Sequence, residues 1–184
     1  MSIPSGRALL DSERLLKDAG LKQNMRYADF GSGSIGHFVF PASAIVGSEG
    51  NVYAVDVLRS ALGAIDGRSK MENVNNITSV WGNFETKNGV RLEEGSLDLI
   101  SFINVTSHLI RTSVVIGEVN RLLNKNGRVL VVGWCKDSGS MIVPSDSRIS
   151  KEVVKEYFIN ANFIEIKDFK AGPQHWGLVF KLEA

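Results

Sequence analysis

Short apolar runs alternate with segments of helical periodicity along most of this chain. The apolar runs predict seven strands, at residues 25–30, 52–55, 77–81, 97–103, 128–132, 163–169 and 177–182. Apolar residues spaced three and four apart between these runs predict helices at residues 6–19, 35–46, 58–65, 115–123 and 150–160. Pro41 should remove a hydrogen bond from the second of these helices and bend it.

The alternation of strands and helices predicts an α/β fold with a Rossmann-like, doubly wound sheet and right-handed crossovers. The run at 97–103 is apolar on both faces, as a central parallel strand should be. Residues 170–174 form a connection between the last two strands that is short enough for a hairpin, so we expect the seventh strand to be antiparallel in an otherwise mostly parallel sheet. Residues 1–184 should form a single domain, with an N-terminal helix within residues 1–20 at its edge.

Composition narrows the functional classes only slightly. The chain has 184 residues, 43% of them hydrophobic and 22% charged, and a net charge of +1. Because its basic residues are dispersed, we do not expect strong, sequence-independent binding to nucleic acid. Cys135 is the only cysteine, so no internal disulfide can form. The sequence has neither a signal-like N-terminus nor an apolar run of about 18 residues, so we expect no membrane span and a cytoplasmic location. We expect no metal site, and an oligomer is possible.

A glycine-rich turn follows the first predicted strand. Residues 27–36 read YADFGSGSIG, which is typical of a strand end, a tight turn and a helix start. Asp56 ends the second predicted strand, twenty residues after Gly36. A glycine turn with an acidic residue at this distance indicates a nucleotide-binding crevice in a Rossmann-type sheet.

The identity of the nucleotide depends on Asp29. The glycines at 31, 33 and 36 match the dinucleotide pattern, which would favour NAD. Asp29, however, precedes Gly31 by two residues, and its carboxylate would repel a pyrophosphate. It would favour a ligand with an ammonium group, such as the methionine end of S-adenosylmethionine. The Tyr-x-x-x-Lys pair of short-chain dehydrogenases is also absent from the chain.

Five segments together resemble the class I S-adenosylmethionine-dependent methyltransferases, including the ubiquinone- and menaquinone-biosynthesis group. They are residues 29–36 (motif I), 55–56 (the acidic end of strand two), 82–85 (the adenine side), 96–105 (strand four) and 122–130 (helix, turn and strand five). The resemblance covers roughly residues 20–184. It implies one methyltransferase domain that binds S-adenosyl-L-methionine and releases S-adenosyl-L-homocysteine.

The resemblance also implies a set of cofactor-binding residues. Asp29 would hold the methionine ammonium, and Gly31 and Gly33, with Ser34 in the same turn, would let the backbone approach the methionine and ribose. Asp56 would accept hydrogen bonds from both ribose hydroxyls. Val57 and Phe84 would pack on the adenine, and Asn83, where the family commonly has aspartate, would accept a bond from the adenine amino group. Asn104 would lie where strand four meets the transferred methyl group.

Each of these residues also has a purely structural interpretation. The glycines could serve only a tight turn, and Asp56 could cap the end of its strand. Asn83 could be a turn residue, and Phe84 could belong to the core. These alternatives remain open at the level of the sequence.

No catalytic base is evident in the sequence. Methyl transfer from a sulfonium needs a general base only if the acceptor must lose a proton. His108, after the fourth strand, is a candidate base, although a surface histidine is the simpler interpretation. Cys135 is a candidate nucleophile or, more simply, a partly buried structural residue.

The methyl acceptor is expected to be a small molecule. Trp134, Met141, Ile142 and Pro144, after the fifth strand, could line its pocket or merely anchor a loop. Two alternatives stay open: a module that binds S-adenosylmethionine without transferring its methyl group and, less favoured, an NAD(P)-binding Rossmann protein.

Overall fold

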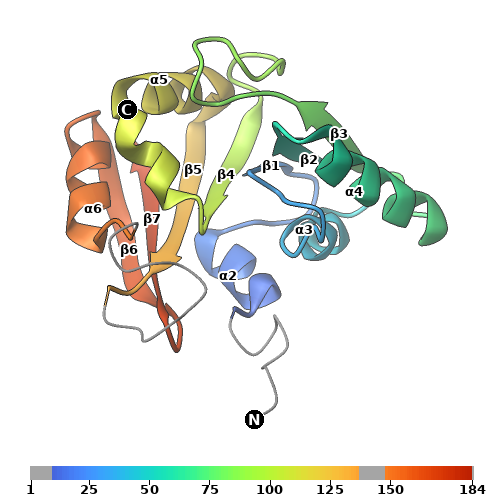
Figure 1. Ribbon diagram of the computed structural model, residues 1–184, viewed down its shortest axis with the longest axis horizontal. Coiled ribbons are helices and arrows are strands. Elements are labelled where there is room, and N and C mark those ends of the chain that lie inside the picture. Colours follow the sequence, from blue (N-terminus) through green and yellow to red (C-terminus); the bar gives the residue numbers. More distant parts are fainter. Residues whose placement is uncertain (1–9, 137–147, 184) are drawn as a thin grey trace.

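The computed structural model describes residues 10–136 and 148–183, which build one mixed sheet covered by helices (Figure 1). Its strands are β1 (Arg26–Phe30), β2 (Asn51–Asp56), β3 (Ile77–Trp81), β4 (Leu97–Ile103), β5 (Leu123–Trp134), β6 (Phe163–Gly172) and β7 (His175–Leu182). The helical elements are α2 (Ser12–Ala19), α3 (Val39–Val46), α4 (Arg59–Met71), the 3-10 helix η1 (Thr106–Arg111), α5 (Thr112–Leu122) and α6 (Lys151–Ile159).

The sheet has the order β3-β2-β1-β4-β5-β7-β6. Strands β1 to β5 are parallel, whereas β7 runs antiparallel to both β5 and β6. The predicted α/β class and the antiparallel seventh strand are therefore confirmed. The order of strands reverses between β1 and β4, and a crevice outside the carboxyl ends of neighbouring strands at such a point is where open α/β sheets bind ligands.

Successive side chains point to opposite faces along each strand, and on the central strands the side chains of both faces are buried. On one face, Tyr27 and Val52 pack in a cluster with residues of α2, α3 and α4. On the other face, Phe30 and Ile100 pack in a cluster with residues of α5 and α6 (Figure 1). The central strands thus lie between two helical layers, whereas β3 and β6, at the edges of the sheet, have exposed residues along their lengths.

Two helices begin later than predicted. Helix α2 starts at Ser12, where the Asp11 side chain accepts a hydrogen bond from the Arg14 amide as an N-cap; residues 6–9 of the predicted helix lie outside the described residues. Helix α3 starts at Val39 instead of residue 35, because Gly33 and Gly36 both have φ of 62° and cannot belong to a right-handed helix.

The prediction for Pro41 was wrong for a related reason. Because α3 begins at Val39, Pro41 is the third residue of the helix. The first amides of a helix have no partner within it, so a proline at this position removes no hydrogen bond.

Strand ends also differ from the predictions. Strand β5 begins at Leu123, five residues earlier than predicted, and takes the residue assigned to the end of the preceding helix; Leu123 pairs with Leu97 on β4. Strands β6 and β7 are longer than predicted and leave Pro173 and Gln174 as the connection of the hairpin. Among the described residues, no helix combines the length and the apolarity needed to cross a bilayer.

Candidate functional site

A cavity of about 390 Å³ lies at the carboxyl ends of β1 and β4, where the strand order reverses. Its wall includes five of the predicted cofactor residues, Asp29, Gly31, Gly33, Ser34 and Asn104. Leu10, Phe38, His37 and Ile103 complete much of the remaining wall. The fold therefore brings together residues from the glycine turn and from the end of β4 that are about 70 positions apart in sequence.

The glycine turn has a backbone that other residues adopt only with strain. Gly31 has φ of 79°, and a Cβ atom there would lie 2.7 Å from Val105 Cγ1. Gly33 has φ of 62°, but a Cβ atom there would meet no atom within 4 Å. Gly31 is thus required by packing and conformation together, whereas Gly33 leaves open space beside its backbone for a ligand.

Asp29 is buried at the base of the cavity, with 4% of its surface exposed. The Ser101 hydroxyl donates a hydrogen bond of 2.6 Å to Asp29 Oδ1. Burial raises the pKa of Asp29 to about 6; the hydrogen bond from Ser101 and the nearby Tyr27 hydroxyl oppose this increase, and the charge of Asp56 adds to it. Among the described residues, no lysine or arginine lines this cavity. A buried carboxylate without a protein cation is a suitable partner for a ligand's ammonium group.

A second polar group in the turn lacks a partner. The Ser32 hydroxyl oxygen is fully buried and forms no hydrogen bond, while Ser32 lines the same cavity. Because this oxygen is fully buried, a ligand in the cavity does not reach it in this arrangement. The Asp29 carboxylate and the open side of Gly33 fit the amino acid end of S-adenosylmethionine. Sequence reasoning did not single out Ser32.

Asp56 connects the end of β2 to the glycine turn. Its Oδ2 accepts a hydrogen bond of 3.0 Å from the Gly33 amide, and its Oδ1 accepts one of 2.9 Å from the Leu58 amide. The residue is 8% exposed. Asp56 therefore does cap the strand end, as the structural alternative held. Each carboxylate oxygen can accept a second bond, so the predicted ribose contact is compatible with the cap.

An exposed apolar surface lies beside Asp56. Val57 is 49% exposed, and Trp81, which pairs with Asp56 in the sheet, is 51% exposed. The Trp81 indole donates a hydrogen bond to the Val57 carbonyl, and the Arg59 guanidinium lies 4.7 Å from the Trp81 ring centroid. Sequence reasoning missed Trp81; its position at the end of the strand next to Asp56 was the available signal.

Asn83 and Phe84 form local and core contacts. The Asn83 side-chain oxygen accepts a hydrogen bond of 2.9 Å from the Glu85 amide, which makes a turn. Phe84 is buried; its ring stacks on Phe30 at 5.4 Å and lies edge-on to Phe102 at 5.5 Å. Both structural alternatives therefore describe these residues, and the adenine contacts remain predictions.

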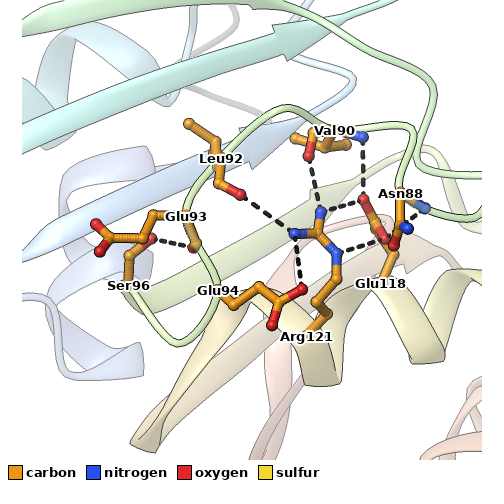
Figure 2. Close-up of polar contacts among 8 residues, drawn as sticks. All are labelled: Asn88, Val90, Leu92, Glu93, Glu94, Ser96, Glu118 and Arg121. Atoms are coloured by element: carbon orange, nitrogen blue, oxygen red, sulfur yellow. Dashed lines mark hydrogen bonds and ion pairs between the residues drawn. The ribbon is translucent and has the colours of Figure 1, made fainter.

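A buried ion pair holds the segment 82–96 that connects β3 to β4 (Figure 2). Glu118 accepts hydrogen bonds from the Asn88 and Val90 amides, and Arg121 donates to the Val90 and Leu92 carbonyls. Arg121 also binds Glu118 at 2.6 Å. Burial raises the pKa of Glu118, but the hydrogen bonds from Arg121 and the backbone outweigh this and lower it overall. The pair thus fixes residues 88–92, which belong to neither a helix nor a strand.

His108 lies apart from the cavity wall around Asp29. It belongs to η1, where its Nδ1 is 3.2 Å from Glu85 Oε1 and its side chain is 53% exposed. Asn104, four residues earlier, does reach the cavity, and its backbone has φ of 58°. The structure therefore brings Asn104 to Asp29 but places His108 at the surface, as the simpler interpretation held.

The hairpin region contains a buried histidine beside the end of β5. His175 is 1% exposed, its two ring nitrogens have no hydrogen-bond partner, and its ring lies 4.0 Å from that of Trp134. Burial lowers the pKa of His175 to about 4. Trp134 is buried, and Cys135 is a half-buried free thiol. Met141, Ile142 and Pro144 lie outside the described residues, so the proposed acceptor pocket after β5 stays a prediction.

Comparison with known proteins decides the family. The family model described as "Methyltransferase domain" matches residues 21–174. The chain belongs to this methyltransferase-domain family. Membership confirms the resemblance to class I S-adenosylmethionine-dependent methyltransferases and the cofactor S-adenosyl-L-methionine; the ubiquinone-like subgroup stays a prediction. Among curated proteins, no significant match was found.

Solved structures support the fold of this methyltransferase. A S-adenosylmethionine-dependent methyltransferase from Aquifex aeolicus has a TM-score of 0.88 at 23% identity, covering 97% of this chain and 93% of that one. A putative type 11 methyltransferase from Sulfolobus solfataricus has a TM-score of 0.72 at 21% identity, covering 96% and 94%. A putative rRNA-methylase from Clostridium thermocellum has a TM-score of 0.70 at 17% identity, covering 100% and 99%. At these identities the likeness concerns the fold alone.

Proposed function

We propose that this methyltransferase transfers the methyl group of S-adenosylmethionine to a small molecule, and that residues 1–184 act as one catalytic domain. The observation that carries the proposal is the buried Asp29 carboxylate, which faces a cavity with no lysine or arginine in its described wall. A phosphate-bearing dinucleotide would place like charge beside Asp29, whereas an ammonium satisfies that carboxylate. Asp56 can bind ribose hydroxyls of either ligand.

The residues of the site would act mainly by holding the cofactor. When bound, S-adenosylmethionine supplies an activated methyl group, which an acceptor lone pair can attack in line as the bond to sulfur breaks. Asp29 would bind the ammonium, Asp56 the two ribose hydroxyls, and the open side of Gly33 would admit the backbone of the ligand. Holding the methyl carbon and the acceptor in near-attack geometry supplies much of the rate enhancement in such a reaction.

The choice of a small acceptor rests on charge. Similar structures include a putative rRNA-methylase and a putative sarcosine dimethylglycine methyltransferase, so the fold is compatible with either class of acceptor. A nucleic acid surface needs a stripe of lysine and arginine. Here 21 basic residues are balanced by 20 acidic ones and are dispersed along the sequence. This balance favours a small molecule.

Calorimetric titration tests the cofactor assignment. We expect S-adenosylmethionine and S-adenosylhomocysteine to bind with micromolar-range dissociation constants, corresponding to about 8 kcal/mol, and NAD not to bind. Binding of NAD alone would overturn the proposal. Turnover of S-adenosylmethionine to S-adenosylhomocysteine with pooled small-molecule acceptors would then separate a transferase from a module that only binds.

The binding module remains the second candidate because of one feature of the cavity. Among the described wall residues, the side chains able to take up a proton are Asp29 and His37, and His37 Nε2 already contacts the Leu10 carbonyl at 3.0 Å. Because a carbonyl oxygen only accepts, Nε2 carries the donated proton, so an acceptor that must lose a proton would find only the Asp29 carboxylate and His37 Nδ1 in this part of the wall. Binding without turnover across the acceptor pool would favour this alternative.

A further inference from the structure

Three side chains form a buried hydrogen-bonded chain beneath the cavity. The Tyr27 hydroxyl lies 2.6 Å from Ser101 Oγ, and Ser101 Oγ lies 2.6 Å from Asp29 Oδ1. Tyr27 and Ser101 are completely buried, and Asp29 lines the cavity. Tyr27 and Asp29 lie on one face of β1, and Ser101 pairs with Asp29 across the β1–β4 boundary. The chain therefore ends at the point where the strand order reverses.

The direction of the hydrogen bonds follows from the number of protons. An ionised carboxylate can only accept, so the single Ser101 hydroxyl proton must point to Asp29. Tyr27 must then be the donor to Ser101. Burial and the neighbouring Asp29 raise the pKa of Tyr27 well above its ordinary value, so the hydroxyl keeps the proton that this arrangement requires. The chain thus donates from Tyr27 through Ser101 to Asp29.

The two oxygens of Asp29 consequently differ. Oδ1 receives the Ser101 proton, whereas Oδ2 accepts no hydrogen bond from a described residue. Asp29 lines the cavity, and Oδ2 is its oxygen that is left without a hydrogen bond from the described residues. A proton on Oδ1 would force both hydroxyls to reverse and leave the Tyr27 proton without an acceptor among the described residues. Protonation is therefore directed to Oδ2, the oxygen available to a ligand.

We propose that Tyr27 and Ser101 are positioning residues that make a proton and the ligand's ammonium compete for the same oxygen, Asp29 Oδ2. The inference rests on the proposed binding of S-adenosylmethionine in this cavity. Its consequence is a cofactor affinity that falls in mildly acidic solution, with a midpoint set by the hydroxyl chain. It also explains why two hydroxyls are buried at positions that would otherwise suit apolar side chains in a central sheet.

Two other titratable groups, Asp56 and His37, lie near Asp29. Asp56, at the end of β2, adds a negative charge that favours protonation of Asp29. His37, on the α3 side of the cavity, has Nε2 against the Leu10 carbonyl. No lysine or arginine faces the cavity from the described elements. Asp29 is thus the group for which we expect a proton and the ligand's ammonium to compete.

Calorimetric titration with S-adenosylhomocysteine between pH 5 and pH 8 tests the inference. For the unaltered protein we expect constant affinity above about pH 7 and a loss approaching tenfold per pH unit below about pH 6. Ser101→Ala should move the midpoint upward by about one to two pH units, because a hydrogen bond to the charged form is lost. Tyr27→Phe should move it in the same direction by less. Asp29→Asn should bind weakly with no midpoint in this range.

Matched controls separate this effect from a general loss of a buried hydroxyl. Tyr53→Phe removes a tyrosine hydroxyl that binds Arg26, and Ser69→Ala removes a buried hydroxyl on α4; both should keep the original midpoint. The probe 5′-methylthioadenosine, which lacks the ammonium, should bind without this pH dependence. Thermal melts establish whether each variant is folded. If Ser101→Ala is unfolded, the midpoint measured for Tyr27→Phe decides the test.

The outcomes discriminate between the two proposals. Absence of S-adenosylhomocysteine binding at pH 8 would overturn the proposed function, and this inference with it. Binding by the unaltered protein, with the same midpoint in Ser101→Ala and Tyr27→Phe, would overturn only the role of the hydroxyl chain. A midpoint that persists in Asp29→Asn would assign the titration to another group and overturn it as well.

Discussion

The Gly33 amide donates a hydrogen bond of 3.0 Å to Asp56 Oδ2, which ties the glycine turn after β1 to the end of β2. The two residues lie 23 positions apart, one in the turn after β1 and the other at the end of the neighbouring parallel strand β2. Asp56 thereby orders the turn before any ligand arrives, so the same carboxylate supports the backbone that would approach the cofactor and offers its remaining lone pairs to the ribose.

Asp56→Ala should weaken the binding of S-adenosylhomocysteine by at least about tenfold, equivalent to about 1.4 kcal/mol. The variant loses the proposed ribose bonds and also the anchor of the Gly33 amide. Calorimetry provides the measurement. Asp66→Ala is the matched control: it removes an exposed carboxylate of α4 that accepts a hydrogen bond from Ser79, and it should bind S-adenosylhomocysteine with unchanged affinity. Equal affinity of the two variants would contradict the ribose assignment.

Asp29→Asn should make the ligand-free protein more stable at pH 7 while impairing cofactor binding. The pKa of Asp29 is raised from 3.8 in the unfolded chain to about 6 in the folded protein, so ionising this carboxyl costs stability above pH 6. That cost is absent below about pH 3.8, and it develops as the pH rises from there through 6. Removing the charge should gain up to about 3 kcal/mol at pH 7.

Urea denaturation at pH 7 and pH 4 provides the measurement for Asp29→Asn. The gain in stability should be present at pH 7 and largely lost at pH 4, where most Asp29 carboxyls are already neutral in the folded protein. A variant less stable than the unaltered protein at pH 7 would show that Asp29 is compensated by a partner. Asp66→Asn, at the surface, should show no gain.

Arg121→Ala should cost about 3–5 kcal/mol of unfolding free energy, because Glu118, whose side chain is 2% exposed, would become an unpaired buried charge. The loss should also release the Val90 amide, whose hydrogen exchange would accelerate. Glu13→Ala removes a partner of the exposed Lys17 pair at the same 2.6 Å separation and should cost less than about 1 kcal/mol. Similar costs for both variants would contradict the role of burial.

His175→Phe should remove a component of acid sensitivity. Burial lowers the pKa of His175 from 6.5 to about 4, so the unfolded chain gains this proton before the folded one does. Stability is therefore lost as the pH falls from 6.5 towards 4. Relative to the unaltered protein, the variant should gain up to about 2 kcal/mol between pH 7.5 and pH 5. Urea denaturation at both pH values measures this.

The control for His175 is a histidine with an exposed ring. His108→Phe replaces a side chain that is 53% exposed, so its stability at pH 7.5 should stay close to that of the unaltered protein. At pH 7.5, His175→Phe should be neutral or stabilising, because two unpartnered nitrogens leave the core. A strong loss of stability at that pH would indicate a hydrogen-bond partner for the imidazole.

The fold class followed from local patterns, whereas element boundaries depended on particular residues. Apolar periodicity correctly indicated all seven strands, since a central strand is buried on both faces wherever it lies in the sheet. The start of α3 was misplaced because the pattern of apolar residues from Ile35 onward does not show that Gly36 needs a positive φ. Leu123 joined β5 instead of the preceding helix because Leu97 on β4 was available as its partner.

The sequence by itself determined the family, the cofactor and the pairing of a glycine turn with Asp29 and Asp56. These features depend on residues near one another in the chain and on backbone conformations that only certain residues adopt. The tertiary structure alone decided which polar atoms already have a hydrogen-bond partner and which do not. Ser101 reaches Asp29 across 72 positions and Glu118 reaches the Val90 amide across 28, so burial and hydrogen bonding at these carboxylates arise only when distant strands and helices pack together.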